Sequence, residues 1–429
     1  MSAREAKLKR IASRNVALDG ELIQTVSSIL SAVRECGDSA VIDYTLRFDG
    51  IDLRDIGLRV TTQTLKKSAE SVDQKFLKAI RESINRVRNF HLRQREESWV
   101  FESGHGALLG QRISPIESAG LYAPGGTASY PSSVIMNVVP AQVAGVKRIV
   151  VITPPRTLSE NPAVAATLLE LGVEEIYRVG GAQGIAALAF GTESIERVDK
   201  ITGPGNKYVA AAKKLVFGVV GIDSIAGPSE IVIIADDTAR ADFVAADLLA
   251  QAEHAQDASA ILVTVSEALA RAVAVEVVRQ AENLPRRAIV QKSLENYGAI
   301  FIVNSMDEAC ELVNRLAPEH LELITDDDRA VGDNIRHAGA IFFGAHTPEA
   351  VGDYFAGPNH VLPTGGSARF SSALGVYDFV KRTSILSYSC DELNSSAEMI
   401  ATLAEAEGLQ AHANSVLIRM KSGNVVGSA

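Results

Sequence analysis

The chain has 429 residues, of which 47% are hydrophobic and 22% are charged, a composition typical of a globular protein with two or three domains. This composition excludes global disorder, and a net charge of −10 argues against the broad basic surface of a nucleic-acid-binding protein. The cysteines Cys36, Cys310 and Cys390 are far apart and odd in number, so neither a disulfide framework nor a cysteine zinc cage is expected.

The first hundred residues are predicted to be mainly helical. Val26, Ile29, Leu30 and Val33 have the spacing of an amphipathic helix, and a second such pattern runs through residues 76–87. The N-terminus lacks the apolar segment of a secretory signal, and the longest apolar runs are far shorter than the ~20 residues that cross a bilayer. We therefore expect a cytoplasmic protein with neither a membrane segment nor a nucleic-acid partner.

From about residue 118 the pattern changes to short β-branched runs that alternate with alanine-rich helical segments. Strands are predicted at residues 148–153, 176–179, 231–235, 261–264, 300–303, 321–324 and 340–343. Helices are predicted at residues 163–171, 207–217 and 241–254, and the chain returns to helix from about residue 378, including residues 397–407. The alternation is typical of parallel sheets covered on both faces, which bind ligands at the carboxyl ends of their strands.

Two pairs of polar residues have spacings that suit chemistry. Gln251 and His254 are three residues apart at the end of a predicted helix, so both side chains can face one metal ion. A solvated helix end, with the imidazole near the helix dipole, is the alternative. Glu319 and His320 are adjacent, and a carboxylate beside an imidazole suits acid–base catalysis, although such dipeptides are also common in structural roles.

A third polar segment runs from Gly352 to His360. It contains Asp353, a hard oxygen ligand, and glycines that can hold backbone close to a ligand. Simple turn formation by its Asp and Asn side chains is the alternative. His412, taken alone, is a surface residue of a predicted helix.

Three glycine-rich segments could bring backbone N–H groups to a pyrophosphate or a ribose: residues 122–126, 180–184 and 203–206. None has the G-x-G-x-x-G fingerprint with its acidic partner, so tight packing turns are the alternative. Ser229 precedes a predicted strand and could donate to a substrate, but it lacks the nucleophile elbow of the serine hydrolases.

Together, these segments resemble the histidinol dehydrogenase family. The resemblance rests on strings that occur in family order, namely A-G-L-Y-A-P-G-G, V-G-G-A-Q-G-I-A-A-L, G-P-G-N-K-Y-V, A-G-P-S-E, A-A-D-L-L-A-Q-A-E-H, A-P-E-H-L-E-L, V-G-D-Y-F-A-G-P-N-H-V-L-P-T, D-F-V-K-R-T-S and E-G-L-Q-A-H-A. It extends over nearly the whole chain, and the first hundred residues are its least specific part.

The resemblance implies an enzyme of the last step of histidine biosynthesis that oxidises L-histidinol through L-histidinaldehyde to L-histidine. It implies one Zn²⁺ per subunit and two molecules of NAD consumed in each cycle. It also implies an intertwined homodimer in which the C-terminal segment of one subunit completes the active site of the other.

The resemblance further implies a role for individual residues. The implied zinc ligands are Gln251, His254, Asp353 and His412, and the implied acid–base pair is Glu319 and His320. The implied substrate contacts are Ser229, His360 and Glu407, together with the zinc ligands and His320. The implied NAD contacts are Tyr122, Gln183 and Asn206.

The expected fold class is α/β, with two incomplete Rossmann-like parallel-sheet domains and helical segments at both ends. We expect an N-terminal helical segment at residues 1–20 and a discontinuous domain, with the metal and acid–base residues, at 21–121 and 230–372. The inserted Rossmann-like domain with the NAD contacts is expected at 122–229, and the C-terminal helical segment at 373–429.

Other functions stay open at this point. A related NAD-dependent dehydrogenase could act on another small amino or sulfonated alcohol, although Glu407 and His412 in the C-terminal motif favour histidinol. Metal, carboxylate and histidine also suit a zinc hydrolase, which would need no nicotinamide. A non-catalytic binding protein would need neither zinc nor turnover.

Overall fold

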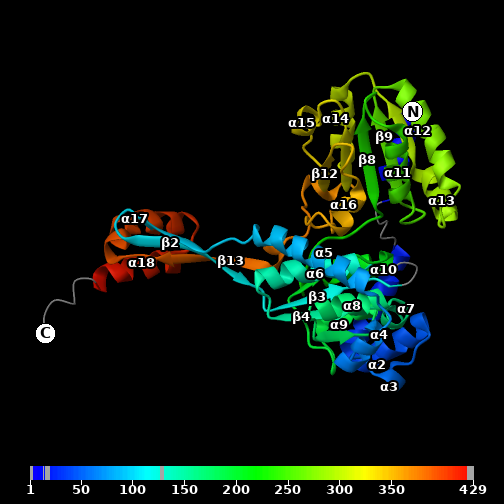
Figure 1. Ribbon diagram of the computed structural model, residues 1–429. Coiled ribbons are helices and arrows are strands. Elements are labelled where there is room, and N and C mark those ends of the chain that lie inside the picture. The colour runs from blue at the N-terminus through cyan, green and yellow to red at the C-terminus, as the bar shows by residue number, and fades with distance from the viewer. Residues whose placement is uncertain (1–2, 13, 15–19, 126–129, 423–429) are drawn as a thin grey trace. The chain divides into compact units, whose positions relative to one another are not determined.

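The computed structural model describes residues 3–12, 14, 20–125 and 130–422 (Figure 1). The chain divides into two compact units, a larger one of Met1–Gln94 and Ile116–Phe379 and a smaller one of Arg95–Pro115 and Val380–Ala429. The larger unit contains two parallel five-stranded sheets with helices around them. This arrangement confirms the α/β class expected from the sequence.

The first parallel sheet has the strand order β5-β4-β3-β6-β7. Its strands are β3 (Ser118–Tyr122), β4 (Arg148–Ile152), β5 (Glu175–Tyr177), β6 (Lys200–Thr202) and β7 (Gly221–Ile222). The helices before it and between its strands are α2 (Gly20–Asp49), α3 (Leu53–Ile56), α4 (Thr62–Ala69), α5 (Gln74–Leu92), α6 (Pro131–Ala144), α7 (Thr157–Glu160), α8 (Pro162–Glu170), α9 (Gly181–Phe190) and α10 (Lys207–Val216).

Successive side chains of β4 point to opposite faces of this sheet and into two different cores. Val150 and Ile152 pack with α2, α9 and α10 on one face. Val151 packs with α5, α6 and α8 on the other. The early helices α2 and α5 thus share their cores with this sheet, while the domain boundaries expected at residues 121 and 230 stay a prediction.

The second parallel sheet has the strand order β10-β9-β8-β11-β12. Its strands are β8 (Glu230–Ala235), β9 (Ser259–Thr264), β10 (Ala299–Ile302), β11 (His320–Ile324) and β12 (Ala340–Phe343), close to the predicted bounds. The other elements of this part are α1 (Ala3–Ala12), α11 (Ala241–Ala252), α12 (Glu267–Ala281), α13 (Arg287–Tyr297), α14 (Met306–Leu316), α15 (Asp328–Asp333), α16 (Glu349–Tyr354), η1 (Ser367–Arg369) and η2 (Val376–Phe379).

Strand β8 is apolar from Ile231 to Ala235 because helices cover both faces of its sheet. Ile231 and Ile233 pack against α11. Val232 and Ile234 pack with side chains of α14 and with Leu8 of α1 on the opposite face. A strand buried on both faces loses the alternation of polar and apolar residues, which explains the I-V-I-I-A run.

The smaller unit contains an antiparallel sheet that the sequence reading missed. Its strands are β1 (Trp99–Ser103), β2 (Ala107–Pro115) and β13 (Val380–Ser387), in the order β1-β2-β13, and its helices are α17 (Cys390–Ala406) and α18 (Gln410–Ser422). The prediction of helix from residue 378 is therefore wrong for β13, which pairs along eight residues with β2. That pairing partner is more than 260 residues away, so local periodicity carries no trace of it.

Among the residues described, no helix is both long and apolar enough to cross a membrane. The three cysteines are unpaired, as expected: Cys310 is buried, and Cys36 and Cys390 are exposed.

Candidate active site

A cavity of about 330 Å³ in the larger unit gathers most of the polar residues singled out from the sequence. This volume is in the range of small-molecule sites. The predicted site residues that line it are Asn206, Ser229, His254, Glu319, His320, Asp353 and His360. Segments that are far apart in the chain thus converge on one hollow.

The acid–base candidates Glu319 and His320 lie at the amino end of β11, so the expectation of a site at the carboxyl ends of the strands is wrong for this sheet. The parallel register pairs His320 with Ile231 of β8. Glu230, one residue earlier, therefore lies beside both candidates: its N–H donates to Glu319 Oε2 at 2.9 Å, and its carbonyl lies 3.2 Å from His320 Nδ1. The amino end of β8 can position both side chains because the N–H and the carbonyl of Glu230, its first residue, contact Glu319 and His320.

His320 is held as a neutral base. Its Nδ1 faces the carbonyl of Glu230 and, at 3.4 Å, the Oε1 atom of Glu349. Because these neighbours are acceptors, Nδ1 carries the proton and Nε2 keeps its lone pair. Nε2 is buried and has no hydrogen-bond partner among the described residues. Burial also lowers the pKa of His320 to about 4, so the ring is uncharged at neutral pH.

Glu319 is buried beside His320, and its environment favours the protonated form. Burial raises the pKa of Glu319 well above its usual range, against the hydrogen bond from the N–H of Glu230; the charges of Glu230 and Asp353 raise it further, and a hydrogen bond from Ser229 opposes them. A carboxyl group with a raised pKa can exchange a proton near neutral pH, which suits acid–base chemistry.

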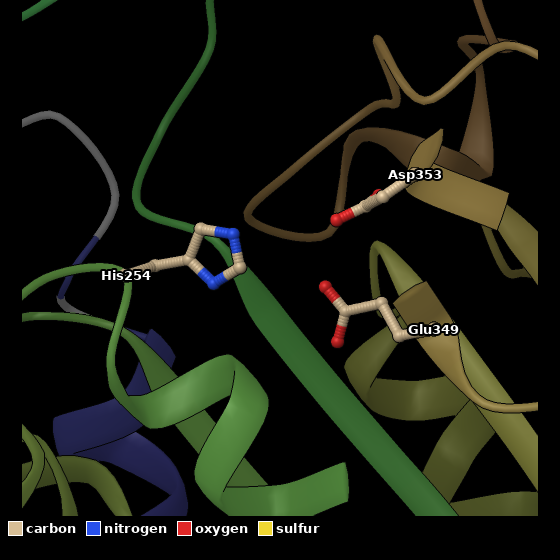
Figure 2. A group of neighbouring side chains, drawn as sticks. All are labelled: His254, Glu349 and Asp353. Carbon is tan, nitrogen blue, oxygen red and sulfur yellow. The ribbon is translucent and has the colours of Figure 1, made fainter. Parts of the chain in front are cut away.

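His254, Glu349 and Asp353 form a cluster that could hold a metal ion (Figure 2). One ligand atom from each lies within 4.8 Å of the others. His254 follows α11, whereas Glu349 and Asp353 are one turn apart on α16. His254 Nδ1 lies 3.1 Å from the carbonyl of Ala250, a contact that leaves Nε2 available as a ligand. An imidazole with two carboxylates suits a divalent ion such as Zn²⁺.

The protonation of the two carboxyl groups in this cluster also fits a cation. Burial raises the pKa of Asp353, but the hydrogen bond and charge of His360, together with the charge of His254, outweigh burial and lower it. Burial raises the pKa of Glu349 well above its usual range, and the charges of Asp353 and Glu319 raise it further. A divalent ion would offset this crowding of buried negative charge.

Gln251 is fully buried against the cluster. With its amide nitrogen turned towards Glu349, that nitrogen lies 3.0 Å from each carboxylate oxygen of Glu349 and can donate to them; it also lies 3.2 Å from Nδ1 of His320, whose own proton faces the carbonyl of Glu230. Gln251 therefore contacts both the metal cluster and the base, and its role as a zinc ligand stays a prediction.

Glu349 is the residue of this cluster that the sequence reading missed. Its signal is its place four residues before Asp353 on one short helix, which puts both carboxylates on one face. Its backbone N–H donates to Oε1 of the buried Glu322 at 2.7 Å, and this bond fixes the start of α16 beside β11.

Two predicted site residues belong to the smaller unit. Glu407 is the C-cap residue that follows α17, and His412 lies in the first turn of α18; both are exposed. Their predicted roles, as a substrate contact and as a zinc ligand, stay predictions.

The three candidate NAD contacts follow strands of the first sheet. Tyr122 ends β3 and is buried, and its hydroxyl accepts from the N–H of Gly181 at 3.3 Å. Gln183 is buried on α9. Asn206 is exposed, lines the cavity and caps α10 through bonds from the N–H groups of Tyr208 and Val209. The end of the glycine-rich segment 122–126, Gly126, lies outside the described residues.

Comparisons with known proteins agree on one family. A family model described as histidinol dehydrogenase matches residues 12–420. Histidinol dehydrogenase from Geobacillus kaustophilus is 56% identical over 401 residues, which cover 93% of this chain and 94% of the relative. The Bacillus subtilis enzyme of the same name is 54% identical and covers 92% of each chain. The crystal structure of histidinol dehydrogenase from Elizabethkingia anophelis is 37% identical, with a TM-score of 0.92, over 98% of this chain and 96% of that one.

Proposed function

Since the chain belongs to the histidinol dehydrogenase family, we propose that it oxidises L-histidinol through L-histidinaldehyde to L-histidine, the last step of histidine biosynthesis. Two molecules of NAD accept the hydrides, and each subunit holds one zinc ion. The observation that carries the proposal is a neutral His320, with Nε2 free to accept a proton, beside Glu319 in a cavity that also contains the cluster of His254, Glu349 and Asp353.

The proposed zinc ligands are Gln251, His254, Asp353 and, from the second subunit of a homodimer, His412. Glu349 lies in the same cluster as His254 and Asp353, and its carboxylate contacts Gln251 and His320. When bound, the ion would supply a Lewis-acid site that helps these residues to orient the substrate. Ser229 and His360 of the cavity, with Glu407 of the second subunit, are the proposed substrate contacts.

In the first oxidation His320 acts as the base. Its Nε2 accepts the hydroxyl proton of histidinol while the hydride on the same carbon leaves for NAD, and the C–O bond becomes the carbonyl of the aldehyde. The carbonyl of Glu230 accepts a hydrogen bond from Nδ1 and stabilises the imidazolium that forms. The proton then returns to solvent.

In the second oxidation the aldehyde gains water before it loses a hydride. Glu319 in its ionised form accepts a proton from water as the oxygen adds to the carbonyl carbon. A nearby divalent cation favours that form, because positive charge lowers the pKa of a carboxyl group. His320 takes the second hydroxyl proton as the second hydride leaves, which yields the carboxylate. Retention of the aldehyde in the cavity protects it from solvent.

The remaining features of the proposal follow the family. Tyr122, Gln183 and Asn206 are the proposed NAD contacts; the last of these lines the cavity. We propose a cytoplasmic location, where a biosynthetic enzyme meets its substrates, and a homodimer whose active sites use the smaller unit of the other subunit.

An assay of NADH absorbance with histidinol tests the proposal. We expect two NADH per histidinol consumed, loss of activity after chelation, and recovery when Zn²⁺ is added. Absence of NADH formation by the zinc-loaded protein would refute the proposed reaction, and full activity in verified metal-free protein would refute the role of the metal.

A mixture of two inactive variants tests the shared site. His320→Ala removes the base and His412→Ala removes the ligand proposed to act in the other subunit. Heterodimers of the two should contain one intact site and recover a fraction of the activity. Verified heterodimers without any activity would contradict sharing.

A further inference from the structure

We propose that Arg14 is a positioning residue for the acid–base pair and acts through Glu230. The inference rests on the proposed function of Glu319 and His320. Arg14 lies just after α1, more than 200 residues before Glu230 in the chain, and within the described part of the chain its hydrogen bonds and ion pair do not reach Glu319 or His320.

The Arg14 side chain is buried and makes contacts on several sides. Only 3% of it is exposed, and its guanidinium forms an ion pair with Oε2 of Glu230. It also donates to the carbonyl of Asp257 at 2.9 Å and to that of Ile11 at 3.1 Å. The guanidinium lies over the ring of Tyr297, 5.4 Å from its centre. A side chain held in this way is a fixed charge, not a surface residue with many conformations.

Glu230 connects this charge to the catalytic pair through its own backbone. Its N–H donates to Glu319 Oε2 at 2.9 Å, and its carbonyl lies 3.2 Å from His320 Nδ1. Its second carboxylate oxygen accepts from the N–H of Gly365 at 3.0 Å. One peptide segment therefore sets the position of both catalytic side chains, and the carboxylate of the same residue is what Arg14 holds.

The consequence of removing Arg14 follows from this geometry. A buried carboxylate that loses its cation must take up a proton or move towards water, because an unpaired buried charge is costly. Either change shifts the peptide groups that bond Glu319 and His320. A misplacement of ~1 Å lowers turnover by as much as about 100-fold.

Arg14 could also have a purely structural role, the attachment of the N-terminal segment, and this role can be tested separately from the positioning of Glu230. Helix α1 has other anchors: Leu8 and Ile11 are buried in the core of the second sheet, and Arg4 pairs with Glu308. Arg4 is partly exposed, and its ion-pair partner lies on α14, away from the cavity. Arg4→Met is therefore the matched control, since it removes an arginine anchor of the same segment and leaves Glu230 paired.

The experiment compares wild type with Arg14→Met, Arg14→Lys and Arg4→Met, all zinc-loaded. For Arg14→Met we expect kcat with histidinol to fall by about 10- to 100-fold, with KM within about 3-fold and zinc content unchanged. Arg14→Lys, which restores the charge, should recover at least part of kcat. Arg4→Met should keep kcat within about 2-fold of wild type.

A folded, zinc-loaded Arg14→Met enzyme with wild-type kcat would overturn the proposal, and so would an equal loss in Arg4→Met. If Arg14→Met does not fold, Glu230→Gln supplies the second test, because it removes the charge that Arg14 neutralises but keeps the side-chain shape. Reduced kcat at unchanged KM supports the proposal, and unchanged kcat overturns it. Failure of the proposed function is separate, since wild type would then not oxidise histidinol.

Discussion

A buried ion pair fixes the backbone of a loop that reaches the cavity, and its contribution to stability can be measured. The side chains of Lys213 on α10 and Asp223 after β7 are 2% and 5% exposed, and they pair with each other. Both side chains also bond to the backbone of Gly203. Lys213 Nζ donates to the carbonyl of Gly203 at 3.0 Å, and the N–H of Gly203 donates to Asp223 Oδ2 at 2.8 Å. Gly203 begins the loop that carries Asn206 into the cavity.

Lys213→Met removes the cation and leaves Asp223 charged and buried. Loss of one partner of a buried pair costs about 3–5 kcal/mol, so we expect the free energy of unfolding to fall by that order. The variant also removes the hydrogen bond from Lys213 to the carbonyl of Gly203, a residue packed so closely that a Cβ there would lie 2.3 Å from the carbonyl oxygen of Tyr122. The loop should therefore lose order together with stability.

Urea unfolding at one protein concentration measures this change. Arg271→Met is the matched control, because Arg271 pairs with Glu267 on the surface and is 77% exposed; it should leave the unfolding midpoint unchanged within error. The double variant Lys213→Met with Asp223→Asn should be more stable than Lys213→Met alone. A loss below about 1 kcal/mol for Lys213→Met, or a double variant that is no more stable, would refute the reasoning.

Three further predictions concern the site and its pH dependence. Asp353→Ala should lower the zinc content per subunit measured by metal analysis; unchanged stoichiometry would contradict its role as a ligand. Glu319→Gln should slow oxidation of the aldehyde more than oxidation of the alcohol in separate assays of the two steps, and equal losses would exclude it as the water activator. Burial lowers the pKa of His91 below the ordinary 6.5, against the hydrogen bond with Gln94. The unfolded chain therefore takes up a proton below about pH 6.5 before the native protein does, and stability falls as pH falls through this window. His91→Gln should flatten that part of the curve of unfolding free energy against pH, and an identical curve would contradict the assignment.

Strands β8 and β9 of the second sheet could be predicted because burial on both faces leaves continuous apolar runs in the sequence. The run I-V-I-I-A became β8 with bounds within one residue of the prediction. Strands β1, β2 and β13 carry no such mark, because they are partly exposed and the sheet depends on the pairing of β2 with the remote β13. Their stability comes from tertiary pairing, which local periodicity does not encode.

The residues of the candidate site also divide into those that the sequence could predict and those that it could not. Histidines and carboxylates in polar motifs, such as Glu319 and Asp353, could be selected by residue type and by resemblance. Glu349 and Arg14 could not, since each has its role only through a neighbour: Glu349 lies one helical turn from Asp353, and Arg14 meets Glu230 across more than 200 residues. Long-range ion pairs depend on packing, and no motif records them.

The two sheets contribute different kinds of residues to one cavity. The first sheet ends in loops at the carboxyl ends of its strands, and Asn206 of one such loop lines the cavity. The second sheet supplies His320 at the amino end of β11, where the first peptide groups of β8 fix the tautomer of the ring. Dehydrogenation of an alcohol removes a hydride from carbon and a proton from the hydroxyl oxygen, so it needs an acceptor for each. If the nicotinamide approaches from the first sheet, the proton leaves towards the second. Backbone N–H groups at the carboxyl ends of the first sheet would suit the proposed phosphate-bearing cofactor, and the carbonyl of Glu230 at the amino end of β8 suits the proposed base.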